Sequence, residues 1–321
     1  MPDVILTDLA DGYQAAISNG LERLGSAATL RPGDRVTVKP NLTYPVYRPG
    51  VMTRLEAIEA LVKHLKEAGC QVTVCESDSG GYNRFSMDDV FRATGLVDLA
   101  ARYDIRLLNL SGGPSRDVRV RAGLRRLRVP LPLAVTDETD LFITMPVPKV
   151  HANTILSGAI KNQWGVIQDP RVRLRLHPFF PQVIHAVHQA LPRTIVIMDG
   201  AYGLDRNGPM RGDAVELGWL LASDSVVAAD LVMAKLMGFD WRRVPHMAYM
   251  ARCQPDVAWD EIECNPNHRQ FQRARFHLER EWTDLAGWCT FHSRLLAWLG
   301  YDSPFAAPLH RLLYCFREPF Y

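Results

Sequence analysis

The segment Met145–His177 reads MPVPKVHANTILSGAIKNQWGVIQDPRVRLRLH. An apolar run, LFITM over Leu141–Met145, leads into it and is typical of a buried strand. Pro146 and Pro148 end that strand, because proline cannot donate a backbone hydrogen bond. Polar side chains then follow closely: Lys149, His151, Asn153, Thr154, Ser157, Lys161 and Asn162. Gly158 lies among them and Gly165 shortly after them. Because open α/β folds bind ligands beyond the carboxyl ends of their strands, the segment predicts both the fold class and the site.

A strand, helix and strand precede this segment and predict a parallel pair. Residues 35–39 (RVTVK) and 71–75 (QVTVC) read as strands, and residues 54–68 between them have the apolar spacing of an amphipathic helix. Asn41 follows the first strand in a polar loop, and the loop Glu76–Gly81 (ESDSGG) follows the second. We therefore predict an α/β protein with parallel βαβ units, a mixed sheet and a helical C-terminal region.

The chain divides by composition near residue 238. Further strands are expected over residues 4–9, 105–110 and 194–198, helices over 13–24, 90–103, 181–191 and 223–237, and an antiparallel pair within 117–130. The tail holds five of the seven tryptophans and few strand patterns. We predict an α/β domain over residues 1–238 that carries the site, and a helical, aromatic-rich region over 239–321. Its tryptophans must pack on that domain, on a second copy in a homodimer, or at a membrane surface.

Composition excludes several classes of protein. The 321 residues are 47% hydrophobic and 22% charged, with a formal net charge of +2, so we expect a globular protein without a nucleic-acid partner. The six cysteines form no CxxC pair, so no iron–sulfur cluster motif is present. The sequence shows neither a secretory signal nor an apolar run as long as a membrane span, and we expect a cytoplasmic protein. Six arginines within residues 116–128 indicate either a solvated basic hairpin or a contact with anionic lipid or polyphosphate.

The candidate site residues fall into three groups. Lys39 and Asn41 after one strand, and Lys149 and Asn162 in the central segment, are candidates to bind an anion. Lys161 is a candidate nucleophile or base, because desolvation activates an amine. His151, which shares a face with Lys149 in an extended chain, and Asp78 in the loop Glu76–Gly81 are candidates to move a proton or orient a hydroxyl. Alternatively, Asp78 forms an ordinary turn and the glycines serve packing.

Several motifs together resemble the family called domain of unknown function 362. They are VKPNL (residues 38–42), CESDSGG (75–81), VPKVHANTILSGAIKNQWG (147–165), RLRLH (173–177), MDG (198–200), GPMRG (208–212) and LASDSVVAAD (221–230). The resemblance runs from about Arg35 to Gly238. Some members carry appended iron–sulfur motifs, which this sequence lacks. The activity of the family is not generally assigned.

A more distant resemblance is to the lactate racemase, or nickel pincer, superfamily. His151 precedes Lys161 by ten residues, and His177 follows it by sixteen. In that superfamily the corresponding lysine carries a nickel pincer nucleotide, the first histidine is an acid/base and the second ligates nickel. The resemblance implies a metal role for His177. A second acid/base histidine of that superfamily has no counterpart in ESDSGG, where Asp78 is the available substitute.

These observations lead to two alternative functions. The first is an enzyme that acts on a small carboxylate or phosphate at a lysine–histidine site, with isomerase-like or oxidoreductase-like chemistry and with nickel, another divalent metal or a lysine-attached cofactor. The second is a non-catalytic accessory protein that binds a nucleotide or a metal for a partner. The missing second histidine and the aromatic tail favour the second, whereas the density of lysines and histidines favours the first.

Overall fold

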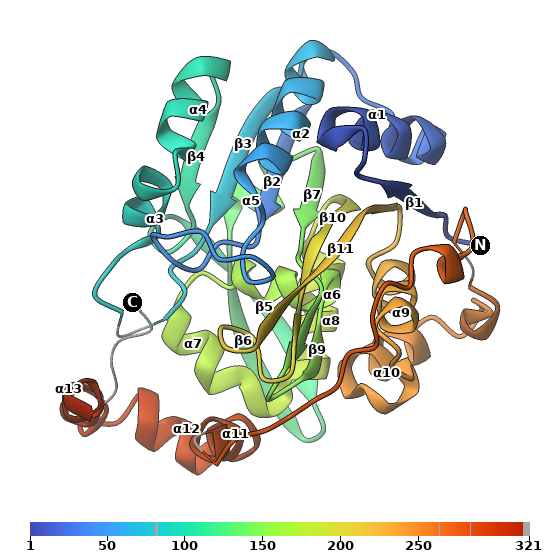
Figure 1. Cartoon of the computed structure of the whole chain (residues 1–321). Coiled ribbons are helices and arrows are strands. Elements are labelled where there is room, and N and C mark those ends of the chain that lie inside the picture. The colour runs from blue at the N-terminus through green and yellow to red at the C-terminus, as the bar shows by residue number, and fades with distance from the viewer. Residues whose placement is uncertain (81–82, 263, 283, 317–321) are drawn as a thin grey trace.

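The computed structural model describes residues 1–80, 83–262, 264–282 and 284–316. It confirms the α/β class: a mixed sheet lies between two layers of helices (Figure 1). The main path of the sheet has the strand order β1-β11-β10-β7-β2-β3-β4. These strands are β1 (Val4–Asp8), β2 (Arg35–Pro40), β3 (Gln71–Glu76), β4 (Arg106–Asn109), β7 (Leu141–Met145), β10 (Arg193–Asp205) and β11 (Asp213–Ser223).

The strands that carry the site are parallel. The ladders β10–β7, β7–β2, β2–β3 and β3–β4 are all parallel, whereas β11 pairs antiparallel with β10 and with β1. In the register, Lys39 lies opposite Thr144 and Pro40 opposite Met145. The carboxyl ends of β2 and β7 therefore reach the same edge of the sheet, which brings their following loops together.

One face of the sheet is covered by the first four helices. These are α1 (Gly12–Leu24), α2 (Leu55–Glu67), α3 (Met87–Ala93) and α4 (Leu96–Tyr103). The single helix expected over residues 90–103 is wrong, because the chain breaks at Gly95. That glycine has φ +79°, a left-handed conformation that a helix interior excludes. Ile17, Ile58 and Leu61 pack beneath this layer and are almost fully buried.

The opposite face is covered by helices from the second half of the chain. They are α5 (Leu133–Thr136), α6 (Ala159–Asn162), α7 (Pro170–Leu176), α8 (Phe180–Ala190), α9 (Val226–Leu236) and α10 (Pro245–Arg252). The helix expected from residue 223 begins later, at Val226, because the Ser225 hydroxyl accepts a hydrogen bond from the backbone nitrogen of Ala228 and caps it.

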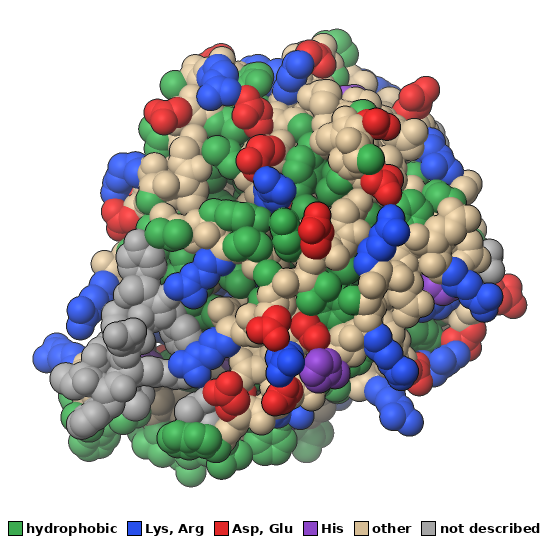
Figure 2. All heavy atoms as spheres, in the orientation of Figure 1, with side chains coloured by type: hydrophobic (Ala, Val, Ile, Leu, Met, Phe, Trp, Pro, Cys, Tyr) green, Lys and Arg blue, Asp and Glu red, His purple; other side chains and the backbone are tan. Residues whose placement is uncertain are grey.

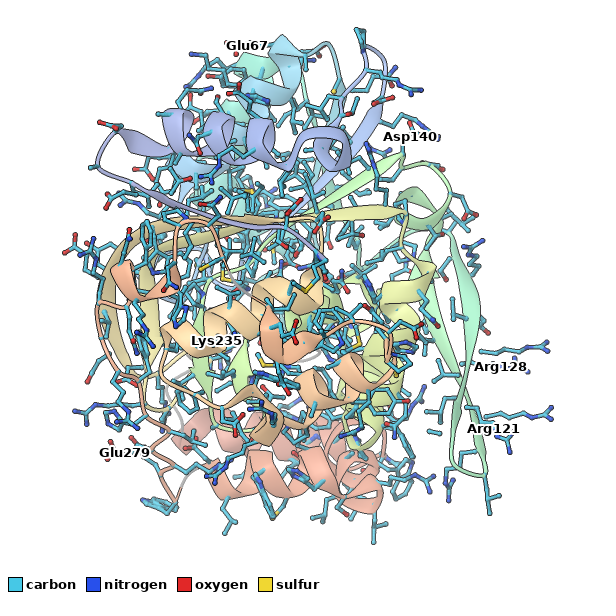
Figure 3. The ribbon with its side chains drawn as sticks, turned by 90° about the vertical axis from the view of Figure 1, so that its right-hand side faces the viewer. Glu67, Arg121, Arg128, Asp140, Lys235 and Glu279 are labelled. Carbon is cyan, nitrogen blue, oxygen red and sulfur yellow. The ribbon has the colours of Figure 1, made fainter. Side chains whose placement is uncertain are left out.

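Two hairpins extend from the sheet. β8 (Lys149–His151) pairs antiparallel with β9 (Ile155–Ser157) and touches β10 at Leu204. The antiparallel pair expected within residues 117–130 is confirmed as β5 (Ser115–Ala122) and β6 (Arg125–Pro132). Figure 3 shows this second hairpin projecting from the body, with Arg121 and Arg128 directed outward.

The chain after residue 238 is mostly helical, as its composition indicates. Val244, Met247 and Trp259 are buried in the same core as the sheet. Asn265 bridges to Ile5 of the edge strand, so this part packs directly on the α/β layers. The last helices are α11 (Asp284–His292), α12 (Arg294–Tyr301) and α13 (Ala306–Phe316). Within the described ranges, every helix is too short or too polar to cross a bilayer.

Candidate functional site

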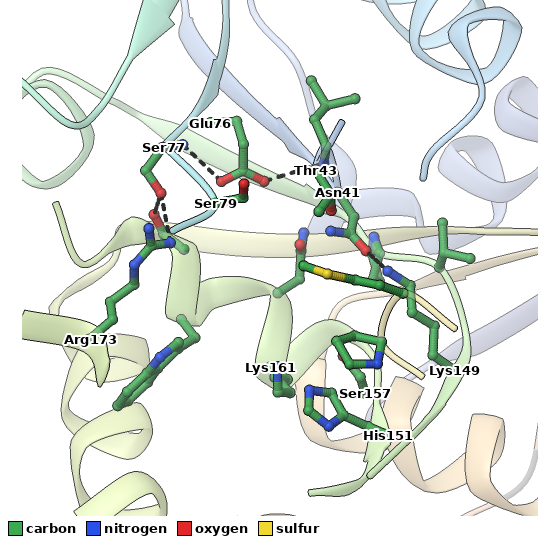
Figure 4. A pocket seen from close by; sticks show the side chains of 18 of the residues that line it. Asn41, Thr43, Glu76, Ser77, Ser79, Lys149, His151, Ser157, Lys161 and Arg173 are labelled. Atoms are coloured by element: carbon green, nitrogen blue, oxygen red, sulfur yellow. Dashed lines mark hydrogen bonds between the residues drawn. The ribbon is translucent and has the colours of Figure 1, made fainter. Parts of the chain in front are cut away.

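A cavity of about 270 Å³ lies beyond the carboxyl ends of the parallel strands (Figure 4). Seven of the eight site residues predicted from the sequence line it: Lys39, Asn41, Lys149, His151, Lys161, Asn162 and His177. They come from β2 and the loop that follows it, from β8, from α6 and from the short helix His177–Phe179. Sequence segments more than one hundred residues apart therefore meet at one point of the fold.

A buried ion pair forms the floor of the cavity. The Lys39 ammonium lies 2.7 Å from the Glu76 carboxylate, and both side chains are at most 5% exposed. Glu76 also accepts a hydrogen bond from the backbone nitrogen of Ser77 at 2.9 Å. A Cβ atom added to Gly165 would come within 2.8 Å of both partners. The close passage of the chain at Gly165 therefore needs glycine, which explains this glycine of the central segment.

Asn162 holds the ion pair in place, and its amide groups are bonded within the protein rather than left for a ligand. Its amide nitrogen donates to the carbonyl oxygen of Lys39 at 3.1 Å and to the Thr144 hydroxyl at 2.8 Å. Its amide oxygen accepts from the Lys39 ammonium at 3.3 Å. These three hydrogen bonds occupy most of the hydrogen-bonding capacity of the side chain. Asn162 is therefore a positioning residue in this structure.

Lys149 is a buried cation held by neutral groups. Its ammonium donates to the side-chain oxygen of Asn41 and, at 2.5 Å, to the backbone carbonyl of Val51. Burial, followed by the positive charge of Lys161, lowers the pKa of Lys149 to about 7. Asn41 itself is held by its backbone nitrogen, which donates to the Thr53 hydroxyl at 2.8 Å. A lysine without a carboxylate contact at this depth favours a negatively charged ligand.

Lys161 lies at the centre of the cavity in the view of Figure 4. Among the described residues its ammonium has no hydrogen-bond or ion-pair partner. Burial, and then the charges of Arg173 and Lys39, lower the pKa of Lys161 to about 8. The short helix α6 that carries it is held at its start by Asp230, which accepts from the backbone nitrogens of Ala159 (2.6 Å) and Ile160 (3.0 Å). Lys161 is thus a fixed amine with an increased unprotonated fraction near neutral pH.

His151 is neutral and has a defined proton position. Its Nδ1 accepts a hydrogen bond from the backbone nitrogen of Asn153 at 3.1 Å. Burial, and then the charges of Lys161 and Lys149, lower the pKa of His151 well below its usual value. The neutral ring therefore carries its proton on Nε2 and can donate a hydrogen bond from there. This arrangement suits orienting or polarising an oxygen better than removing a proton.

His177 is held by aromatic rings at the cavity wall. Its ring stacks on Trp164, with centroids 5.5 Å apart and planes at 14°, and lies 4.7 Å from Phe291 of α11. Burial and the charge of Lys161 lower the pKa of His177 to about 3. A neutral imidazole is the form that binds a metal. Among the described residues, however, no cluster of three or more His, Cys, Asp or Glu could hold a metal ion.

Asp78 does not belong to this cavity. Its carboxylate accepts hydrogen bonds from the backbone nitrogen of Met87 at 2.6 Å and from the Asn109 side chain at 3.2 Å. It lines a neighbouring surface hollow instead. The loop turns it outward because Ser77, one position earlier, points inward to the carbonyl oxygen of Gly165 at 2.6 Å. The structure thus does not bring Asp78 to the lysines, where it was expected to replace the missing histidine.

Sequence reasoning missed Arg173, Glu76 and Asp230 as parts of the site. Arg173 of α7 is 8% exposed and donates to the Ser77 hydroxyl at 2.9 Å and to the Asp78 carbonyl oxygen. Burial lowers the pKa of its guanidinium. In RLRLH, arginine and leucine alternate, and nothing in this pattern distinguishes the buried Arg173 from Arg171 and Arg175, the two exposed arginines of α7. Glu76 had a usable signal. It is the last residue of β3, and β3 pairs in parallel with β2, which carries Lys39 near its own carboxyl end.

The charges around the cavity do not balance. Four cationic side chains line it: Lys39, Lys149, Lys161 and Arg173. Glu76 is the carboxylate among the described lining residues, and it is paired with Lys39. In a low-dielectric setting, such an excess of positive charge favours binding of one or two negative charges.

Comparisons with known proteins give the following similarities. A family model described as "Domain of unknown function (DUF362)" matches residues 36–235. A thylakoid-associated protein of Synechocystis sp. is 29% identical over 253 residues, which cover 76% of this chain and 75% of that protein. The lactate racemase apoprotein of Thermoanaerobacterium thermosaccharolyticum is 14% identical, with a TM-score of 0.42, over 73% of this chain and 56% of that one. A Thermotoga maritima protein is 11% identical, with a TM-score of 0.45, over 74% of this chain and 59% of that one.

The family match spans the elements that build the cavity, from β2 through the central segment to α9. It also spans the motifs VKPNL, CESDSGG and SGAIKNQWG, which supply about half of the lining residues. The solved structures are longer than the matched part, since this chain covers less than two thirds of either one. On the extent of the family match, this chain belongs to the DUF362 family.

Proposed function

We propose that the protein is an enzyme that acts on a small carboxylate or phosphate bound in this cavity. The observation that carries the proposal is the charge balance: four basic side chains line one cavity, and Glu76, the carboxylate among the described lining residues, is already paired with Lys39. The cavity volume of about 270 Å³ is near the lower end for small-molecule sites, which fits a compact acid rather than an extended ligand.

Arg173 is the best-placed residue to anchor the anion. Its recorded partners are the neutral Ser77 hydroxyl and the Asp78 carbonyl oxygen, so its positive charge is not cancelled by a contacting carboxylate. A guanidinium can bind a carboxylate or a phosphate through two parallel hydrogen bonds. Lys149, held by the oxygens of Asn41 and Val51, would add a second positive charge.

Lys161 and His151 would then act on the bound molecule. Lys161 can serve as a base, or as a nucleophile that forms a covalent bond to a carbonyl carbon, because its amine is unpaired and its pKa is lowered to about 8. His151 would donate from Nε2–H to a hydroxyl or carbonyl oxygen of the substrate. These two roles are compatible with isomerase-like or oxidoreductase-like chemistry on a hydroxy or oxo acid.

The same residues could hold a lysine-attached cofactor. The unpaired amine of Lys161 fits such an attachment, and the neutral ring of His177 fits one ligand position of a nickel or other divalent ion carried by the cofactor. Such a group would supply electron-accepting chemistry beside the bound anion. The intact mass of protein purified from its native host tests this directly, because an adduct on Lys161 adds a fixed mass that Lys161→Ala lacks.

A second function, non-catalytic binding of the same anion, is favoured by one observation. Asp78 points away from the cavity, Glu76 is locked to Lys39, and His151 is a hydrogen-bond donor. The lysine amines are then the groups that could remove a proton, and of these Lys149 already donates to Asn41 and Val51, whereas Lys161 has no partner among the described residues. If Lys161→Ala abolishes turnover but leaves the affinity for the anion unchanged, the result supports the proposal that the protein is an enzyme. Anion binding without turnover of any hydroxy or oxo acid supports the binding protein.

Thermal unfolding with inorganic phosphate and malonate tests anion binding. A probe at ~100 times its Kd should stabilise the protein by about 2.7 kcal/mol. Arg173→Gln should remove most of this stabilisation, whereas Arg171→Gln should keep it, because Arg171 is exposed on the same helix and pairs with Asp169. An equal response of the two variants contradicts the anchor role of Arg173, and no response of the wild type to any anion contradicts the proposal.

A further inference from the structure

The three C-terminal helices present many apolar side chains to solvent. Leu295 of α12 is 64% exposed, and Phe305, between α12 and α13, is 72% exposed. Figure 2 shows hydrophobic side chains gathered along the edge of the molecule where Figure 1 places α11 and α12. The exposed apolar side chains of this surface are Leu285, Trp288, Leu295, Leu296, Trp298, Leu299, Phe305, Leu309 and Leu312. So many exposed apolar residues on neighbouring short helices indicate a surface that contacts something.

A ladder of arginines covers the outer face of the β5–β6 hairpin. Arg119 lies directly opposite Arg128, and Arg121 directly opposite Arg126. Like charges opposite each other destabilise a strand pair, so this face carries a cost in the isolated protein. Arg128 lies 3.9 Å from Asp117, whereas Arg119, Arg121 and Arg126 have no carboxylate partner among the described residues. At the tip, Leu124 is fully exposed.

The two features reach the same end of the molecule. In Figure 1 and in the perpendicular view of Figure 3, the tip of the β5–β6 hairpin and the helices α11–α13 both lie at the lower end. Figure 3 places Asp140, beside the start of β2, toward the opposite end from Arg121. We propose that this end, formed by α11–α13 and the β5–β6 hairpin, docks on the surface of an anionic lipid bilayer.

The chemistry of both parts fits the headgroup region of a bilayer. Amphipathic helices with tryptophan and leucine insert their apolar face at the boundary between headgroups and acyl chains. Arginines beside such a face attract anionic headgroups. Asp302, directly after α12, lies 3.4 Å from Arg175, which offsets its charge, and Asp284 at the start of α11 accepts a hydrogen bond from Asn207 at 2.9 Å.

A second copy of the chain fits this end less well. A two-fold contact through the apolar helices would cover the apolar side chains, but it would not give the arginine ladder the anion-rich surface that a bilayer offers. At a bilayer with negative headgroups, the apolar side chains would enter the interface, and the arginines, which project sideways from the hairpin in Figure 3, would attract the headgroups around it. The docking surface also adjoins the cavity, because Phe291 of α11 lines the cavity and contacts the His177 ring.

Flotation of the full chain with lipid vesicles tests the proposal. The protein should bind vesicles of mixed phosphatidylcholine and phosphatidylglycerol and should bind pure phosphatidylcholine weakly. Each arginine near an anionic surface contributes a factor of about five in affinity, so Arg121→Glu combined with Arg126→Glu should weaken binding by about 30-fold or more. Arg31→Glu combined with Arg106→Glu makes the same change of charge at two exposed arginines of the opposite end and should leave binding unchanged.

A second pair of variants tests the apolar part. Leu295→Ser combined with Trp298→Ser should abolish vesicle binding, whereas Val97→Ser, at an exposed apolar position on α4, should not. All seven positions that are changed in the two tests are exposed, so circular dichroism should show an unchanged fold. Light scattering without lipid is measured in parallel. A stable dimer that dissociates in the Leu295/Trp298 variant, with no vesicle binding by the wild type, would overturn the proposal. Equal binding to neutral and anionic vesicles would overturn it as well.

Discussion

Because the chain has only six lysines, the pKa of Lys161 can be measured separately from those of the others. Burial and the charges of Arg173 and Lys39 lower this pKa to about 8 from a usual value of 10.5. At pH 7 the amine of Lys161 is then ~10% unprotonated, against ~0.03% for an ordinary lysine, which is ~300 times more free amine. The substitution to test is Arg173→Gln, because the charge of Arg173 lowers the pKa of Lys161 more than the charge of Lys39 does.

Competitive acetylation over a series of pH values, with mass spectrometry of each lysine, provides the assay. Labelling of Lys161 should have its midpoint near pH 8, and Arg173→Gln should move it upward by roughly one unit. Arg171→Gln, an exposed change on the same helix, should leave it in place. Lys63, an exposed residue of α2, gives the rate of a surface amine. A midpoint for Lys161 near 10.5, or a midpoint that does not move in Arg173→Gln, would refute the electrostatic reasoning.

Three further predictions concern the cavity and the core behind it. Lys39→Met should cost about 3–5 kcal/mol by leaving Glu76 buried and unpaired, and adding Glu76→Leu should recover much of that loss in urea unfolding. Gly165→Ala should destabilise by about 1–3 kcal/mol, whereas Gly112→Ala, which meets no atom within 4 Å, should be tolerated. Burial lowers the pKa of His246 to about 3, so the neutral ring contributes stability that is complete above about pH 6.5 and is lost as the pH falls toward 3. His246→Phe should therefore make unfolding less sensitive to acid over that range, as followed by circular dichroism.

Local patterns predicted the parallel strands well because each strand has its own signal. LFITM became β7 with the same limits as expected, and RVTVK became β2 with one residue added. The loops after these strands were correctly expected to carry the site, since the parallel arrangement brings their ends together. The break at Gly95 was missed, because an amphipathic spacing continues across it and the left-handed conformation of one glycine leaves no periodic mark.

The orientation of side chains in the loops could not be derived from spacing. Asp78 and Ser77 are neighbours, and only the contact of Ser77 with Gly165, 88 positions away, decides which one faces the cavity. Arg173 has an inward position because α7 packs beside the loop Glu76–Gly81, a contact between distant segments. Asp230 lies in an apolar run, where its partners at Ala159 and Ile160 are invisible before the chain folds. Residues that hold a site in place are thus harder to predict than residues that line it.

The way in which the cations are held suggests why the cavity is ready for an anion before one binds. A buried ammonium or guanidinium normally lies against a carboxylate, because desolvation of an unpaired charge is costly. Here Lys149 is held by an amide and a carbonyl oxygen, and Arg173 by a hydroxyl and a carbonyl oxygen. These neutral partners fix the geometry of both side chains without pairing them with a carboxylate, and a bound anion would favour the protonated form of Lys149, whose pKa burial lowers to about 7. The stability that the fold forgoes by keeping the charges apart from carboxylates becomes available as binding energy when a carboxylate or phosphate enters the cavity.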